Sequence, residues 1–168
     1  MKLFVACLAF VTFACGKDTE KPQTVTLKLA DPGPGVSVKK VKEMGHGEEV
    51  VVEGRVSNIV TGVAAFNLID VSLDYCGQKS PEDSCKTPWD YCCEDAGDRA
   101  AATISVEKRG ADGKIMGQGT HLPMLRLLDV VAAKGKIEKD DHGNVTVVAT
   151  SWFVRERPQL PDDLHWPK

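Results

Sequence analysis

The sequence predicts an all-β domain, a small barrel of five strands, and three observations predict it. Five segments alternate apolar and polar residues with the period of two that is typical of strands with one buried face. Two of these segments hold a glycine in mid-strand, Gly54 and Gly135, where glycine weakens a flat sheet but permits the sharp bend of a closed barrel. The order of the predicted elements, three strands, a short helix and two strands, favours a barrel over an open sheet or a β-sandwich.

The residues before the barrel predict a tether and one helical turn. The segment 15–35 begins charged and ends in alternating prolines and glycines, a composition typical of a linker. Within it, the alternation over 24–29 allows a short added strand. Ser37 then predicts the N-cap of a helical turn over 38–44 whose valines and methionine share one face.

The barrel strands follow in order along the chain. They are predicted at 48–56, 63–71, 102–108, 130–138 and 145–154. A short helix is predicted over 122–128 despite Pro123, and residues 140–144 predict the hairpin turn between the last two strands. This order is that of an OB-fold, a five-stranded Greek-key barrel, which we expect to span 36–155. A proline-rich tail, 156–168, follows it.

The first 14 residues predict a secretory signal. Lys2 gives a positive start, and the apolar run 3–14 is shorter than the ~20 residues of a membrane-spanning helix. The sequence Val-Thr-Phe-Ala-Cys at 11–15 resembles the lipobox of bacterial lipoproteins, although Thr12 stands where that family usually has leucine. The resemblance implies a lipoprotein signal peptide over 1–14, cleaved before Cys15.

Lipid on Cys15 would place the protein in the bacterial cell envelope. In the family that it resembles, the cysteine receives diacylglycerol and further fatty acid such as palmitate, which anchors the chain to a membrane. The domain would then lie on the periplasmic side, and Gly16 after the cysteine favours the outer membrane. The alternatives are an ordinary cleaved signal that discards Cys15, or a buried core segment.

Composition and motifs argue against an enzyme and against nucleic-acid binding. A net charge of -3 lacks the basic footprint that drives sequence-independent affinity for nucleic acids. No HExxH, GxSxG or phosphate-binding glycine loop is present. On the second predicted strand, alternation places Phe66 with Leu68 in the core, so no aromatic there is available to stack on bases.

Two segments of the chain resemble segments of a known group of proteins. Residues 47–56, Gly-Glu-Glu-Val-Val-Val-Glu-Gly-Arg-Val, resemble the opening strand of bacterial OB-fold domains. Residues 85–93 read Cys-Lys-Thr-Pro-Trp-Asp-Tyr-Cys-Cys, a segment typical of small envelope lipoproteins with an OB-type domain. The resemblance implies the fold and the envelope location, and it brings no settled activity.

Four cysteines of the mature chain lie between the second and third predicted strands: Cys76, Cys85, Cys92 and Cys93. In an exported protein an even set is first interpreted as disulfides, with Cys76 and Cys85 each paired to one of the adjacent two. One such crosslink over a ~15-residue loop contributes ~3 kcal/mol in the chain-entropy model.

A metal site is the second interpretation of these cysteines, because four thiolates satisfy zinc or Cu(I). The C-x8-C-x6-C-C spacing lacks the paired CxxC of structural zinc sites. Redox catalysis by the adjacent cysteines is the third interpretation, without a CxxC or a neighbouring histidine to support it. No other cofactor is expected.

The sequence thus favours a non-enzymatic, membrane-anchored envelope lipoprotein. Its OB domain would bind a protein or a small ligand, with Trp89, Asp90 and Tyr91 of the loop facing it. The alternative is a metal-binding (copper or zinc) or redox envelope protein that uses the loop cysteines. The third hypothesis is binding of single-stranded nucleic acid or oligosaccharide by the barrel.

Overall fold

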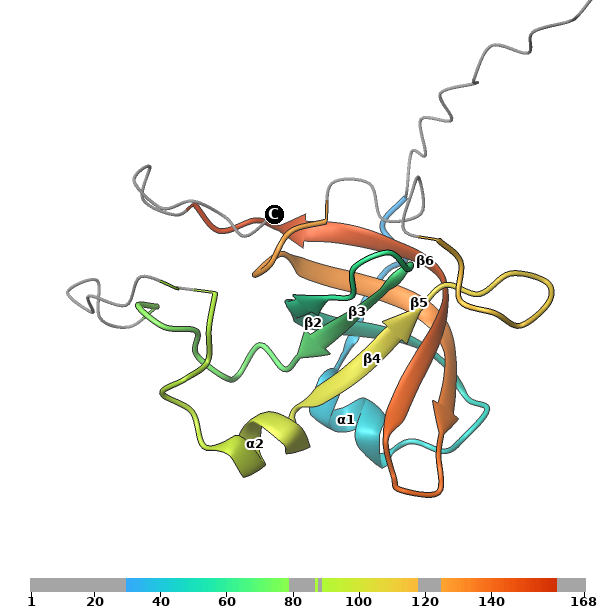
Figure 1. The fold of residues 1–168 in the computed structure, drawn as a ribbon, viewed down its shortest axis with the longest axis horizontal. Coiled ribbons are helices and arrows are strands. Elements are labelled where there is room, and N and C mark those ends of the chain that lie inside the picture. Colours follow the sequence, from blue (N-terminus) through green and yellow to red (C-terminus); the bar gives the residue numbers. More distant parts are fainter. Residues whose placement is uncertain (1–29, 79–86, 88, 118–124, 160–168) are drawn as a thin grey trace, which may run out of the picture.

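The computed structural model describes residues 30–78, 87, 89–117 and 125–159 of the chain. Its elements, in order, are β1 (Val36–Ser37), α1 (Val38–Glu43), β2 (Glu49–Ile59), β3 (Ala65–Ile69), α2 (Ala96–Ala101), β4 (Thr103–Glu107), β5 (Val130–Lys139) and β6 (Val145–Glu156). The five predicted strands are β2 to β6, and the prediction of an all-β, OB-type barrel is confirmed (Figure 1).

The sheet closes on itself through β2. The strands neighbour one another in the order β2-β3-β4-β6-β5, and β2 also pairs with β5. The pairing of β4 with β6 is parallel, whereas the other pairings around the barrel are antiparallel. The two-residue strand β1, which the sequence did not predict, adds in parallel to β2.

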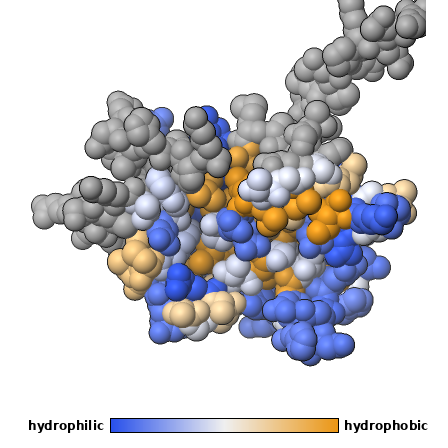
Figure 2. Space-filling model, viewed as in Figure 1, coloured by the Kyte–Doolittle hydropathy of each residue, from blue (hydrophilic) through white to orange (hydrophobic). Residues whose placement is uncertain are grey.

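The alternating apolar residues fill the interior of the barrel. Phe66 and Leu68 of β3 are buried as predicted, at 1% and 0% exposure. The Phe66 ring meets Trp152 of β6 edge-on, with 5.6 Å between the centroids and 79° between the ring planes. Such edge-to-face pairs add to the free energy of burial because the aromatic quadrupoles are complementary. On the face seen in Figure 2, hydrophobic residues gather over the middle of the barrel and hydrophilic ones lie along its lower margin.

The helical turn predicted after Ser37 is α1, which lies below the barrel in Figure 1. The Ser37 hydroxyl accepts a hydrogen bond from the Lys40 amide at 3.2 Å, as an N-cap does. Val38 and Val41, one turn apart, are fully buried in the barrel core. A helix this short depends on tertiary packing, which these two valines supply.

The helix predicted over 122–128 is wrong for the part that the structure describes, residues 125–128, which forms an irregular segment with a turn. Leu128 has a φ of 66°. Its amide donates a hydrogen bond of 2.8 Å to the Val56 carbonyl, and the Val56 amide donates one of 2.9 Å to the backbone carbonyl of Asp129. These two bonds with β2 satisfy the Leu128 amide and the Asp129 carbonyl, groups that a helix would satisfy within itself.

Two arginines at the end of β6 fix the segments that enter and leave the barrel. Arg155 binds Glu53 on β2 and, at 3.0 Å, Asp31 of the incoming segment. Arg157 donates hydrogen bonds of 2.7 and 2.8 Å to the carboxylate of Asp129, which is fully buried. A buried carboxylate needs such charged partners, because removal from water is costly.

The signal peptide predicted at 1–14 lies outside the described residues, as do most of the 15–35 tether and residues 160–168 of the tail. In the part of the chain that the structure describes, no helix is long and apolar enough to cross a bilayer.

The two mid-strand glycines stand where neighbouring elements approach most closely. A Cβ at Gly135 of β5 would lie 2.3 Å from the Val148 carbonyl oxygen of β6 and 2.8 Å from the Ala149 Cα, beside a register shift between those strands. At Gly54 of β2 it would lie 2.8 Å from Val38 of α1. Both glycines therefore permit contacts that close and plug the barrel.

We expect Gly135→Ala to lower the free energy of unfolding by about 1–3 kcal/mol, because the obstructing atoms are backbone and cannot rotate away. Urea unfolding of the protein measures this. Gly117→Ala is the matched control, since a Cβ there meets no described residue within 4 Å. Equal stabilities of the two variants would contradict the packing role of Gly135.

Candidate functional site

The cysteine-rich loop lies between β3 and β4, as predicted, and it includes α2, which was not predicted (Figure 1). Cys76, Cys92 and Cys93 belong to the described residues, whereas Cys85 lies outside them. The site therefore rests on two arms of the loop, residues 70–78 and 89–95.

Arg55 of β2 anchors the first arm on the outer surface of the barrel. Alternation along β2 places this side chain on the outer face, yet it is only 7% exposed because the loop covers it. Its guanidinium donates a hydrogen bond of 2.9 Å to the Leu73 carbonyl and stands 5.0 Å from the centroid of the Tyr75 ring. A carbonyl and an aromatic face thus replace the water that the charge has lost.

Hydrogen bonds hold the two arms side by side. The Cys76 amide donates to the Asp90 carbonyl at 2.9 Å, and the Asp74 amide donates to the Glu94 carboxylate at 3.2 Å. Gly77, with a φ of 80°, turns the first arm directly after the cysteine. These contacts bring Cys76 beside the second arm, which carries Cys92 and Cys93.

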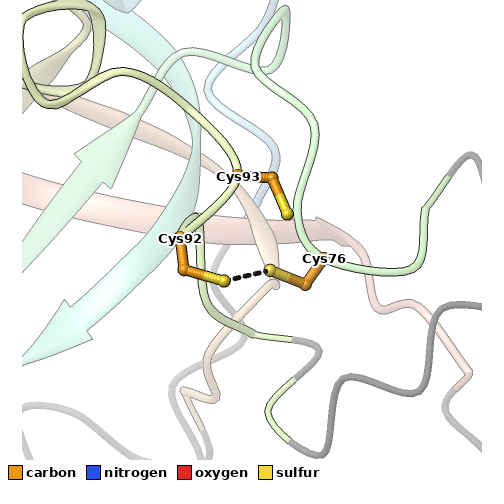
Figure 3. Close-up of side chains that lie close together, drawn as sticks. All are labelled: Cys76, Cys92 and Cys93. Carbon is orange, nitrogen blue, oxygen red and sulfur yellow. Dashed lines mark hydrogen bonds between the residues drawn. The ribbon is translucent and has the colours of Figure 1, made fainter.

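The three described sulfur atoms form a cluster (Figure 3). The Sγ atoms of Cys76 and Cys92 lie 3.2 Å apart, and all three Sγ atoms lie within 4.8 Å of one another. Thiolates about 2.3 Å from a tetrahedral ion stand about 3.8 Å apart, inside this range. The three cysteines can therefore hold a metal ion.

A disulfide was the first interpretation of these residues. No two of the three described sulfurs lie at the bond length of about 2.05 Å, and the pairing of Cys85 lies outside the described residues. Cys76 is 3% exposed, whereas Cys92 and Cys93 are exposed, so the cluster is backed by protein on one side and open to solvent on the other.

Tyr91 anchors the second arm through its buried ring. Its ring is 4% exposed and packs in a second apolar cluster beneath the loop, with Ile69, Leu73, Ala102 and Leu128. Its hydroxyl is buried without a well-oriented hydrogen-bond partner among the described residues. Burial therefore raises the pKa of Tyr91, although the nearby Arg55 guanidinium opposes part of that rise.

A cavity of about 480 Å³ opens where the loop meets the barrel. It is lined by Ser57, Asn58, Ile69, Trp89, Asp90, Tyr91, Arg99, Thr103 and Leu127. The three residues predicted to face a ligand, Trp89, Asp90 and Tyr91, all line it. The volume falls in the range of small-molecule sites.

Arg99, which also lines the cavity, was not singled out from the sequence. It belongs to α2, a helix that was not predicted from the sequence. The available signal was Asp95, which caps the helix by accepting hydrogen bonds from the amides of Gly97 and Asp98, followed by helix-favouring alanines.

No protein-family model matches the chain, and no curated protein matches it. Among solved structures, the chain is similar to an OBody, AM1L10, bound to hen egg-white lysozyme, with 18% identity, a TM-score of 0.44 and coverage of 77% of this chain and 98% of that one. It is similar to a second OBody, AM3L15, also bound to hen egg-white lysozyme, with 18% identity, a TM-score of 0.43 and coverage of 77% and 100%.

We expect Tyr91 to ionise above the ordinary pKa of about 10, because burial disfavours the phenolate. The chain has two tyrosines, so absorbance at 295 nm of the wild type minus Tyr91→Phe isolates this group. The unfolded chain ionises first, so the stability that Tyr91 contributes is present below pH 10 and is lost as pH rises toward the folded pKa. Titration of both tyrosines near 10 would contradict this.

Proposed function

We propose that this protein is a non-enzymatic lipoprotein of the bacterial envelope that binds a soft metal ion, Cu(I) foremost, through its loop cysteines. One observation carries the proposal: the sulfurs of Cys76, Cys92 and Cys93 lie within 4.8 Å of one another. A disulfide needs two sulfurs in contact, whereas a metal site needs three or four around a common centre.

Copper is preferred to zinc because of the ligand type and number. Thiolates are soft ligands that select Cu(I), and Cu(I) accepts three of them. Zinc in structural sites is almost always four-coordinate, so it would need a fourth ligand, for which Cys85 is the candidate in the sequence. No carboxylate or histidine joins the three sulfurs among the described residues.

The arrangement of the loop supports binding without a large rearrangement. The hydrogen bond from Cys76 to Asp90 and the anchoring of Leu73 by Arg55 hold both arms on the rigid barrel. A site whose ligands are positioned by their surroundings binds more tightly, because less conformational entropy is lost on binding. The exposure of Cys92 and Cys93 gives an ion access from solvent.

A second candidate is the disulfide-stapled binding module that the sequence favours. The 3.2 Å between the Cys76 and Cys92 sulfurs supports this pair over Cys76 with Cys93, which would leave Cys85 to Cys93. The loop would then serve to present the adjacent cavity to a ligand. The two candidates exclude each other at any one time, because oxidised sulfurs do not ligate Cu(I).

Binding of single-stranded nucleic acid gains no support from the described strands. Phe66, the aromatic of β3, is 1% exposed, and β4 has no aromatic residue. OB-folds that bind single strands use aromatics on these two strands as stacking platforms. We therefore do not propose it.

We expect the reduced protein to bind one Cu(I) in competition with a chromogenic chelator such as bathocuproine disulfonate. Cys92→Ser should weaken binding by more than the ~10–100-fold that loss of a second-shell partner costs, because a ligand is removed. Cys85→Ser is the comparison variant, and we expect it to lower the affinity for zinc more than the affinity for Cu(I). Absence of Cu(I) binding by the reduced wild type, or unchanged affinity in Cys92→Ser, would contradict the proposal.

For the location, we expect Cys15→Ser to abolish incorporation of radiolabelled fatty acid and to move the protein from the membrane pellet to the soluble fraction. Membrane attachment would depend on lipid at that residue, because acyl chains contribute ~0.8 kcal/mol of membrane-binding free energy per buried methylene. Cys7→Ser serves as the control, because Cys7 lies within the predicted signal peptide. Equal labelling of Cys15→Ser and wild type would refute the anchor.

A further inference from the structure

We infer a second binding site on this loop: the cavity beside α2 takes a small monocarboxylate with an apolar body, and Arg99 binds its carboxylate. This site uses none of the cysteines. It goes beyond the metal binding proposed above, and the two can succeed or fail independently.

The observation that points to a ligand is the Arg99 guanidinium. Its Nε is buried without a hydrogen-bond partner, and the described residues offer it no ion pair. Arg99 as a whole is half-buried, but a buried N–H without a hydrogen-bond partner retains the cost of its desolvation. An anion in the cavity that Arg99 lines would remove that cost.

Three acidic residues near Arg99 in the chain have carboxylates that accept backbone hydrogen bonds elsewhere. The Glu94 carboxylate accepts from the Asp74 amide, the Asp95 carboxylate caps α2, and the Asp90 carboxylate accepts from the Tyr91 amide at 2.8 Å. Each of these groups completes a backbone hydrogen bond of the loop. The guanidinium is thus left for a partner that enters from outside.

The position of Arg99 is set by the fold. It lies in the last turn of α2, and its carbonyl accepts a hydrogen bond from the Thr103 hydroxyl at 2.7 Å at the start of β4. Thr103 and Ser57 of β2 both line the cavity. The arginine therefore projects from a segment held against the barrel strands, as a ligand-binding residue should.

The walls and charges of the cavity define the class of ligand. Ile69, Trp89 and Leu127 supply apolar surface, and Tyr91 lines the cavity beside them. A guanidinium binds a planar carboxylate through two parallel hydrogen bonds. Asp90 lines the same cavity, and its negative charge disfavours a dianion such as phosphate.

Phenylacetate is a suitable probe, because it joins one carboxylate to one aromatic ring. We expect isothermal titration calorimetry on the full acylated protein in detergent to detect its binding at millimolar concentration. Phenylacetamide, which has the same shape and no charge, should bind at least about tenfold more weakly, because hydrogen bonds to charged groups are the stronger ones.

Arg99→Gln should weaken phenylacetate binding by a similar factor, and Arg99→Lys should fall between it and the wild type, because lysine keeps the charge but lacks the planar fork. Lys114→Gln is the matched control for the loss of one positive charge, since Lys114 is exposed and does not line the cavity. Circular dichroism checks the fold of each variant.

Failure of phenylacetate to bind the wild type, or equal binding of phenylacetate and phenylacetamide, would overturn the proposal even if Arg99→Gln does not fold. Equal affinity of a folded Arg99→Gln would also overturn it. The Cu(I) titration of the same samples reports separately on the cysteine cluster, so the two proposals are distinguishable.

Discussion

The structure depends on β2, whose barrel pairing changes from β5 to β3 at Arg55. This residue lies opposite Ile69 of β3 and opposite Val130 of β5, so the barrel closes there. The Arg55 side chain, on the outer surface, also holds the Leu73 carbonyl and thus the first arm of the loop. Closure of the barrel and placement of the cysteines are therefore linked through one residue. Gly54, beside it, allows α1 to approach the same strand.

Period-two alternation was enough to place the five barrel strands to within a few residues, because burial of one face is a local property of each strand. Ser37 marked the start of α1 for the same reason, since an N-cap acts within one turn. The burial of Arg55 could not be predicted, because a loop about 20 residues further along the chain covers it. The turn at Leu128 likewise depends on hydrogen bonds to Val56, distant in sequence.

The candidate site was predictable in composition but not in geometry. The cysteine-rich segment and its aromatic residues stand out in the sequence, and Trp89, Asp90 and Tyr91 do line a cavity. The proximity of Cys76 to Cys92 arises from pairing between two arms of one loop, and such pairing leaves no periodic pattern. Arg99 was missed because a helix as short as α2 shows too few residues for a period of 3.6 to emerge.

The barrel supports the loop, and the loop carries both candidate sites. The barrel supplies rigid edges, and segments 70–78 and 89–95 lie on them through Arg55 and the buried Tyr91 ring. Residues 89–91 contribute to the cavity, whereas the next two, Cys92 and Cys93, turn to the sulfur cluster. The two sites share no residue, but one continuous segment, residues 89–93, carries part of each. A rigid scaffold carrying function on one anchored loop is a common solution, since loops vary without loss of the core.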